Sequence, residues 1–223
     1  MRRFGVRIPT SAQSTEKSLP AYGRKAFKIL KIIQMLNFVL FGPPGAGKGT
    51  QSQKLIDRYQ LIHISTGDLF RDHISKQTSL GKQVSALIAE GQLVPDEITI
   101  AMLEEEVEKN PGTKGFIFDG FPRTVAQAAA LDKFLESKGS AIAAVIALDV
   151  DQEELTKRIA ERQKLTNRVD DQADKLQKRI EEYFSKTIHV LPYYEAQHKL
   201  SKVNGIGDID TIFAELCEVV DQY

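Results

Sequence analysis

A glycine-rich stretch that directly follows an apolar run constrains the fold of this sequence more than any other feature. The apolar run covers residues 36–41, and the stretch that follows it, GPPGAGKGT, covers residues 42–50. The run is apolar enough for a buried strand, and residues 48–59 have the spacing of a helix. A strand, a tight turn and a helix in this order predict the start of an α/β fold.

The composition of this turn predicts that it binds a polyphosphate. Glycines let the backbone close around an anion, and the helix that follows offers unpaired amides and the positive end of its dipole. Lys48 adds a full positive charge. The general phosphate-loop pattern has Ser or Thr directly after the lysine, but here Gly49 takes that place and Thr50 follows. An ordinary Gly/Pro loop is the alternative, which the order of strand, loop, lysine, hydroxyl and helix disfavours.

Apolar runs and helical patterns alternate along the rest of the chain. Strands are predicted at 36–41, 61–64, 115–119, 143–149 and 199–204, and helices at 48–59, 67–76, 80–90, 96–109, 125–137, 152–162, 172–187 and 209–220. Such alternation predicts a parallel sheet of about five strands flanked by helices and joined by right-handed crossovers. Ligands of such sheets lie beyond the carboxyl ends of the strands, so Asp119 and the glycine-rich loop should face one cleft.

The sequence GPPGAGKGTQ resembles the nucleoside monophosphate kinases, specifically the adenylate kinase family, in which the Gly-Thr pair is the usual form. The resemblance implies a phosphate-loop NTPase-like fold with a helical acceptor-binding subdomain and a short lid. It also implies that ATP contacts Gly45, Ala46, Gly47, Lys48, Gly49, Thr50, Arg162 and Gly207. The loop Asn204–Asp208, which contains Gly207, resembles the family's donor-adenine loop, although a glycine turn before a helix is also explained by capping.

Two further segments resemble the family's acceptor site. Residues 65–71, STGDLFR, place Thr66 at the base and Arg71 on the acceptor phosphate, while the backbone of residues 92–94 approaches the adenine or ribose. Helix capping by the hydroxyls of STGDLFR is the simpler local explanation. Relatives that prefer pyrimidine monophosphates typically have Ala in place of this threonine, so Thr66 favours AMP. The implied AMP-binding residues are Thr66, Arg71, Gln92, Leu93, Val94, Gly120, Phe121, Pro122, Arg123, Gln127, Arg168 and Arg179.

The segment DGFPRT, residues 119–124, together with Gln127, is the second strong resemblance to the adenylate kinase family, after the glycine-rich loop. Asp119 at a strand end can hold magnesium through water, together with Thr50, without direct metal ligands from the protein. Arg123 offers a planar donor fork to phosphate, and Gln127 can pair with the adenine edge.

Arginines near the polar loop at about 162–171 complete the predicted catalytic set. By the resemblance, Arg162 contacts ATP, whereas Arg168 and Arg179 reach the reacting phosphates; Arg158 is a weaker candidate. The predicted catalytic residues are Lys48, Arg123, Arg162, Arg168, Arg179 and Asp119. The loop is short, so the larger lid with four cysteines and zinc is not expected.

Residues 1–34 differ in charge from the rest of the chain. They carry eight Lys or Arg residues and one acid, Glu16, so the remaining residues are net acidic although the whole chain is neutral. We interpret 1–34 as an extension of 35–223, the kinase domain, and three possibilities stay open. It is a disordered segment upstream of a true start at Met35, a targeting segment for an organelle, or a functional arm.

Composition narrows the remaining possibilities. The acidic body disfavours nucleic-acid binding, no apolar run is long enough to cross a membrane, and a single cysteine, Cys217, fits a reducing compartment. We expect a cytoplasmic monomer that uses Mg²⁺ to transfer phosphate from ATP to AMP, giving ADP. A UMP/CMP kinase and a nucleotide-binding switch are the alternatives; GTP as donor stays open.

Overall fold

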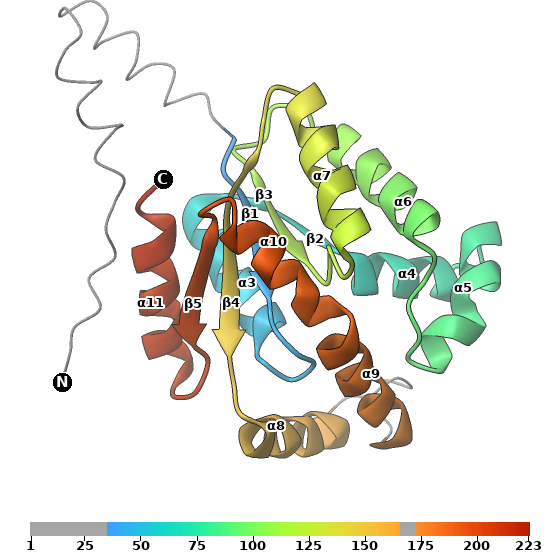
Figure 1. The fold of residues 1–223 in the computed structure, drawn as a ribbon. Coiled ribbons are helices and arrows are strands. Elements are labelled where there is room, and N and C mark those ends of the chain that lie inside the picture. The colour runs from blue at the N-terminus through green and yellow to red at the C-terminus, as the bar shows by residue number, and fades with distance from the viewer. Residues whose placement is uncertain (1–34, 166–172) are drawn as a thin grey trace, which may run out of the picture. The chain divides into compact units, whose positions relative to one another are not determined.

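The computed structural model describes residues 35–165 and 173–223 (Figure 1). Within them lies one five-stranded sheet in the order β2-β3-β1-β4-β5, and every neighbouring pair is parallel. This confirms the predicted parallel sheet flanked by helices. The strands are β1 (Asn37–Phe41), β2 (Ile62–Ser65), β3 (Phe116–Asp119), β4 (Ile142–Asp149) and β5 (Leu200–Asn204).

The register of the three strands β2, β3 and β1 brings their carboxyl ends together. Leu40 on β1 pairs with Asp119 on β3, and Asp119 pairs in turn with Ser65 on β2. Strand β1 ends at Phe41, and the glycine-rich loop begins at the next residue, Gly42. The sheet therefore delivers the loop, the Asp119 carboxyl and the start of the next helix to one edge.

Helices cover both faces of the sheet (Figure 1). Helices α3 and α11 pack on the face that carries Phe38, Leu40 and Ile146, whereas α6, α7 and α10 pack on the face that carries Val39 and Val145. Strand β4 is thus buried on both sides, as its apolar sequence predicts. The helices are α3 (Lys48–Tyr59), α4 (Thr66–Ser75), α5 (Ser79–Ala89), α6 (Asp96–Glu108), α7 (Val125–Ser137), α8 (Gln152–Leu165), α9 (Ala173–Ser185), α10 (Val190–Glu195) and α11 (Ile209–Val220), with a 3-10 turn at Thr187–His189.

Helices α4, α5 and the start of α6 share a small core of their own. It consists of Phe70, Val84, Val94 and Met102, all largely buried. Its tightest point is Gly81 on α5, where an added Cβ would lie 2.1 Å from the carbonyl oxygen of His73. This core is separate from the two cores that flank the sheet, and the acceptor-binding subdomain at 65–94 stays a prediction.

The helix ends follow ordinary capping chemistry. Ser65 accepts from the backbone N–H of Asp68 at the start of α4, and Thr124 accepts from that of Gln127 at the start of α7. The capping that sequence predicted for STGDLFR is therefore present. Asp208 caps α11 by accepting from two backbone N–H groups.

Two features of the fold differ from the sequence-based expectation or lie beyond it. Helix α10 was not predicted, because it spans only Val190–Glu195 and contains Pro192. The predicted lid at about 162–171 falls mainly on residues outside the described ranges, as does Arg168.

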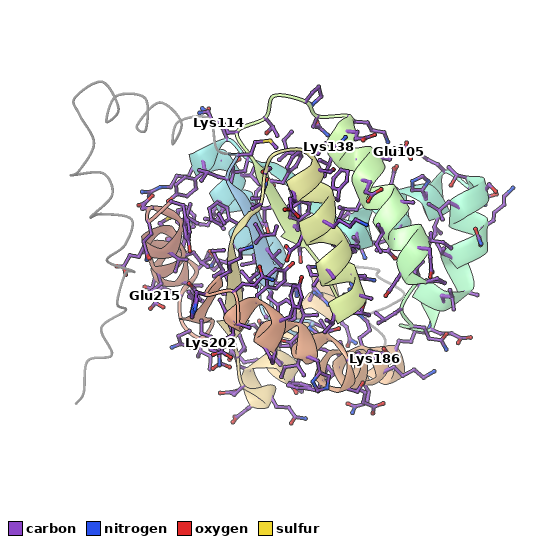
Figure 2. All side chains as sticks on the ribbon, turned by 45° about the horizontal axis from the view of Figure 1, so that its top comes forward. Glu105, Lys114, Lys138, Lys186, Lys202 and Glu215 are labelled. Atoms are coloured by element: carbon purple, nitrogen blue, oxygen red, sulfur yellow. The ribbon has the colours of Figure 1, made fainter. Side chains whose placement is uncertain are left out.

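The outer surface of the described residues is strongly charged. Glu105, Lys138, Lys186 and Lys202 project outward from it (Figure 2). Glu105 pairs with Lys109 one helical turn away at 3.0 Å, which agrees with a solvated face for the acidic run 104–106. No helix in the described part of the chain combines the length and the apolar character needed to cross a bilayer.

Candidate active site

The loop between β1 and α3 has the backbone geometry that an anion cradle needs. Gly45 and Gly47 have φ angles of 89° and 91°, which side chains with a Cβ rarely adopt. The backbone N–H of Ala46 donates to the carbonyl of Pro43 over 3.1 Å, which closes the turn. An added Cβ at Gly45 would also lie 2.8 Å from Ile159 on α8. Close packing and unusual dihedrals together explain why glycine occupies this position.

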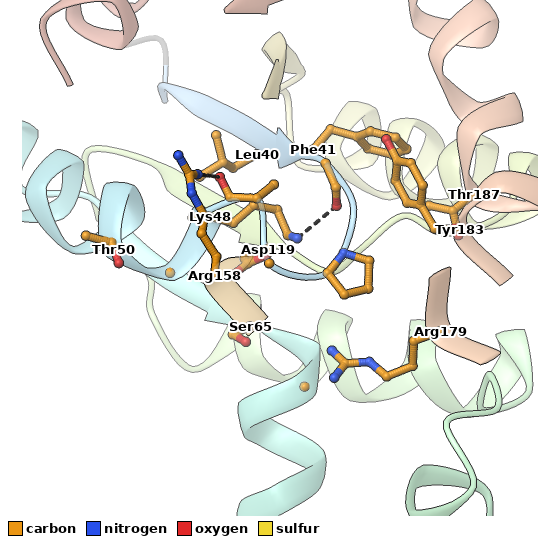
Figure 3. A pocket seen from close by; sticks show the side chains of 18 of the residues that line it. Leu40, Phe41, Lys48, Thr50, Ser65, Asp119, Arg158, Arg179, Tyr183 and Thr187 are labelled. Atoms are coloured by element: carbon orange, nitrogen blue, oxygen red, sulfur yellow. Dashed lines mark hydrogen bonds between the residues drawn. The ribbon is translucent and has the colours of Figure 1, made fainter. Parts of the chain in front are cut away.

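Lys48, the first residue of α3, folds back over the loop that precedes it. Its Nζ donates to the carbonyl oxygens of Gly42 at 2.8 Å and Pro43 at 3.1 Å (Figure 3). Burial of the ammonium group is the largest cause that lowers the pKa of Lys48, and the positive charges of Arg123, Arg179 and Arg162 act in the same direction. Against the attraction of Asp119, these causes together lower the pKa from 10.5 to about 8. The site thus concentrates positive charge that only an anion can relieve.

These cations share one cavity of about 800 Å³ beyond the carboxyl edge of the sheet. Arg179 enters it from α9, whereas Arg158 approaches from α8 beside the glycine-rich loop (Figure 3). Arg158 Nη1 lies 3.5 Å from the carbonyl oxygen of Ala46, and its Nε donates to Glu154 at 2.7 Å. A cavity of this size, lined by loop amides and several cations, suits a polyphosphate ligand.

Asp119, at the carboxyl end of β3, is a carboxylate whose charge interacts with those of Lys48 and Arg123. Burial alone would raise the pKa of Asp119, but nearby His63, Lys48 and Arg123 outweigh burial and hold the pKa below its usual value. The gap between His63 Nε2 and Asp119 Oδ2 is 3.7 Å, too long for a hydrogen bond. The carboxyl group of Asp119 is therefore ionised at neutral pH.

The opposite side of the cavity is built by α4 and the segment after α5. Arg71 pairs with Asp68 one turn earlier on α4 at 2.5 Å, and both line the cavity. Thr66 lies underneath, where its hydroxyl donates to the carbonyl oxygen of Gly120 at 2.9 Å. This bond ties the start of α4 to the segment that carries Arg123.

Most of the residues predicted from sequence line this cavity. They are Gly45, Ala46, Gly47, Lys48, Gly49, Thr50, Arg71, Gln92, Leu93, Asp119, Gly120, Phe121, Pro122, Arg123, Arg162, Arg179 and Gly207. Three others do not line it but are buried at its margin: Thr66, Val94 and Gln127, exposed by 2%, 6% and 2%. Arg168 lies outside the described residues, so its position stays a prediction.

The cavity also contains residues that sequence reasoning did not single out. Lys157 adds a positive charge on α8, Tyr183 and Thr187 come from the end of α9 and the turn after it, and Ile88 and Ile209 add apolar surface. Ile209 is 52% exposed and follows Gly207, an arrangement that suits the face of a base. The sequence signal that could have identified Ile209 was an isoleucine two positions after Gly207.

The residues at the loop are suited to magnesium held through water. Thr50 is exposed at the start of α3, Asp119 is ionised, and both line the cavity. Hydroxyl and carboxylate oxygens are the ligands that Mg²⁺ prefers, and it keeps much of its hydration shell. Among residues 35–165 and 173–223, no group of three or more His, Cys, Asp and Glu side chains is arranged to hold a metal.

Comparisons with known proteins agree with this site. A family model described as adenylate kinase matches residues 40–199. An adenylate kinase of Flavobacterium psychrophilum is 53% identical over 188 residues, which cover 84% of this chain and 99% of that protein. The adenylate kinase of Flavobacterium johnsoniae is 50% identical with the same coverage, and that of Bacteroides thetaiotaomicron is 44% identical, covering 84% of this chain and 100% of that protein.

The family model spans the end of β1, the glycine-rich loop, the strands β2 to β4 and most of the segments that line the cavity, and it ends before β5 and Gly207. These matches favour the adenylate kinase interpretation over the UMP/CMP kinase alternative. The chain belongs to the adenylate kinase family.

Proposed function

We propose that this chain catalyses the reversible transfer of the γ-phosphoryl group of ATP to AMP, which yields two molecules of ADP. The observation that carries the proposal is the convergence of Lys48, Arg123, Arg162 and Arg179 on one cavity that the glycine-rich loop lines. Family membership supports the same conclusion, because it implies a phosphotransferase whose acceptor is itself a phosphate group.

The chemistry asks little of the protein beyond position and charge. An oxygen of the AMP phosphate attacks the γ-phosphorus, the bond from that phosphorus to the β–γ bridging oxygen breaks, and ADP departs with the electron pair. The attacking oxygen is already ionised at neutral pH, so no general base is needed. Charge that spreads over the transferring group is stabilised by cations placed around it.

We assign the cations by the side of the cavity from which each one enters. Lys48 and Arg162 would bind the phosphates of ATP, and Arg71 the phosphate of AMP. Arg123 and Arg179, together with Arg168, would face the transferring group. Thr50 and Asp119 would hold Mg²⁺ through water, and the ion would supply further neutralisation of the phosphate charge.

Water competes with AMP as an acceptor, so the two substrates must be enclosed. The subdomain at 65–94 has its own core, which lets it move toward the loop as a unit. We propose that this subdomain and the lid at about 162–171 close over the bound nucleotides. Closure would also bring Thr66, Val94 and Gln127 into contact with AMP.

We further propose that the protein works as a monomer in the cytoplasm. The single cysteine, Cys217, is buried and reduced, which fits a reducing compartment. Light scattering of the purified chain checks the oligomeric state.

A coupled assay of ADP formation tests the function. ATP and magnesium are supplied with AMP, UMP or CMP, and GTP then replaces ATP. We expect rapid turnover with AMP and little with UMP or CMP. Strong use of UMP with little use of AMP would contradict the roles given to Thr66 and Gln127, and no ADP from any acceptor would contradict the proposal as a whole.

A further inference from the structure

A partly buried hydrogen-bond network joins the first residue of α6 to the start of α7. Asp96 Oδ1 accepts from Nε2 of Gln127 at 2.7 Å, and Asp96 Oδ2 accepts from the hydroxyl of Thr124 at 2.8 Å. The other end of the same amide, Oε1 of Gln127, accepts from the backbone N–H of Arg123 at 2.7 Å. Asp96 therefore joins the start of α6, just after the predicted acceptor segment 92–94, to the start of α7, which carries Gln127. The sequence predicted no role for Asp96 itself.

The partners of Gln127 fix which way its side-chain amide points. A carboxylate can only accept hydrogen bonds, and a backbone N–H can only donate. Nε2 must therefore face Asp96, and Oε1 must face Arg123. Gln127 is 2% exposed, so water does not offer either end an easy replacement. The amide keeps one unused N–H and one unused lone pair in a defined order.

A defined order of donor and acceptor distinguishes purine bases. The adenine edge presents an amino donor beside a ring-nitrogen acceptor. In one orientation, the side-chain amide places its oxygen opposite the amino group and its N–H opposite the ring nitrogen. A six-oxo purine such as hypoxanthine presents a carbonyl acceptor beside an N–H donor, which matches the opposite orientation. An amide that cannot turn accepts the first base and rejects the second, because buried polar groups left unpaired are costly.

We propose that Asp96 is a positioning residue for acceptor recognition, which fixes the Gln127 amide and thereby the preference for adenine over six-oxo purines. This inference rests on the proposed function, in which Gln127 contacts the base of AMP. Asp96 also lies two residues after the segment 92–94, with only Pro95 between them, so its bonds to the start of α7 help to hold that segment beside Arg123.

The chain offers a matched control one residue away. Glu97 lies in the same first turn of α6 and carries the same charge, but its side chain is exposed. Glu97→Ala removes a carboxylate from the positive end of the helix without touching Gln127. It therefore separates the general effect of a lost helix-terminal charge from the effect of freeing the amide.

The experiment measures kcat/KM for AMP and IMP with ATP as donor, for the wild-type chain, Asp96→Ala, Asp96→Asn and Glu97→Ala. We expect Asp96→Ala to raise the KM for AMP about 10-fold and to lower the AMP-to-IMP ratio of kcat/KM by a similar factor, with the KM for ATP unchanged. Asp96→Asn should be intermediate, because asparagine can offer Gln127 either an acceptor or a donor. Glu97→Ala should match wild type.

Three results would overturn the inference. The first is an AMP-to-IMP ratio that stays within twofold of wild type in both Asp96 variants. The second is an equal loss for both purines together with a lower melting temperature, which indicates a purely structural role; Asp96→Asn decides this if Asp96→Ala does not fold. In both cases an active wild-type chain leaves the proposed function standing. A wild-type chain inactive with AMP would overturn the function and this inference together.

Discussion

Under the proposed function, Lys48 combines a role in phosphate binding with a cost to stability, and both have the same physical origin. Burial of its ammonium group and the neighbouring arginines lower its pKa to about 8. Its Nζ donates to the carbonyls of Gly42 and Pro43. These partners are neutral, so they compensate the charge only in part. A bound polyphosphate compensates it fully, which turns a destabilising feature into binding free energy.

Replacing Lys48 by methionine should therefore abolish turnover while the fold persists. We expect Lys48→Met to lower kcat by about 10³-fold or more, because a preorganised charge near the transferring group contributes several kcal/mol to transition-state stabilisation. Initial rates of ADP formation measure the effect. Lys54→Met is the control, since Lys54 lies on the same helix and pairs with Asp210 at 2.5 Å on the surface. Turnover near the wild-type value in Lys48→Met would contradict the assignment.

The lowered pKa of Lys48 also predicts how stability depends on pH. Between the folded pKa of about 8 and the unfolded value of 10.5, the unfolded chain binds more protons. The contribution of Lys48 to the free energy of unfolding therefore rises with pH in this window, and its cost is fully present below pH 8. Lys48→Met removes that cost.

We expect Lys48→Met to be more stable than wild type by about 1 to 2 kcal/mol at pH 7, after allowance for two lost hydrogen bonds of about 1 kcal/mol each. The advantage should shrink as the pH rises toward the unfolded pKa. Urea unfolding of both proteins at neutral and alkaline pH gives the difference, in which the other titrating groups cancel. A difference that does not change with pH would show that burial does not penalise the charge of Lys48.

At the level of the helices, α4 and α5 can pack closely because residue 81 is a glycine and has no Cβ. The Cα of Gly81 faces the backbone of His73 and Ile74, and an added Cβ would lie 2.1 Å from the carbonyl oxygen of His73. Backbone cannot give way as a flexible side chain can. Gly81 therefore sets how closely the two helices pack, and with them the small core around Phe70 and Val84.

Gly81→Ala should loosen this subdomain and leave the sheet intact. We expect a KM for AMP raised about 10-fold or more and a KM for ATP within twofold of wild type, because the glycine-rich loop is not part of the core that α4 and α5 share. Hydrogen exchange should accelerate in α4 and α5 but not in β1 or β4. Gln83→Ala on the exposed side of α5 is the control. Equal losses for AMP and ATP would contradict an independent acceptor subdomain.

The strands and long helices were predictable because their sequence signals are local. Strand β4 is an uninterrupted apolar run, as a strand covered on both sides must be, and α3 follows its glycine turn directly. Helix α10 was not predictable in this way. It has six residues, contains Pro192, and is stabilised by the burial of Val190 and Tyr194 against the rest of the fold. Only tertiary contacts distinguish it from a loop.

The candidate site likewise contains residues that a local sequence pattern identifies and residues that only the fold brings together. Lys48 and Thr50 were identified because the loop motif places them by spacing alone. The positions of Arg158 against the loop and of His63 beside Asp119 depend on how α8 and β2 pack, which no local pattern encodes. The bond between Asp96 and Gln127 joins residues 31 positions apart, so it too required the fold.

The part of the chain that the structure describes begins at Met35, and its first residues already contact the sheet. Leu36 makes two backbone hydrogen bonds around the start of β3: its N–H donates to the carbonyl of Lys114 at 2.8 Å, and its carbonyl accepts from the N–H of Phe116 at 3.1 Å. Met35 packs against the core on the α7 face of the sheet. Residues 35–223 also contain every described residue of the cavity.

A chain that starts at Met35 should therefore fold and work as the full-length chain does. We expect its melting temperature to stay within about 2 °C of the full-length value, which corresponds to less than about 1 kcal/mol for a domain of this size. The kcat/KM for both nucleotides should stay within twofold. Thermal unfolding and the coupled assay on the two forms measure this. If the shorter form loses activity but melts at the same temperature, residues 1–34 take part in binding or catalysis; if it also melts lower, they belong to the folded domain, and the boundary at Met35 is wrong.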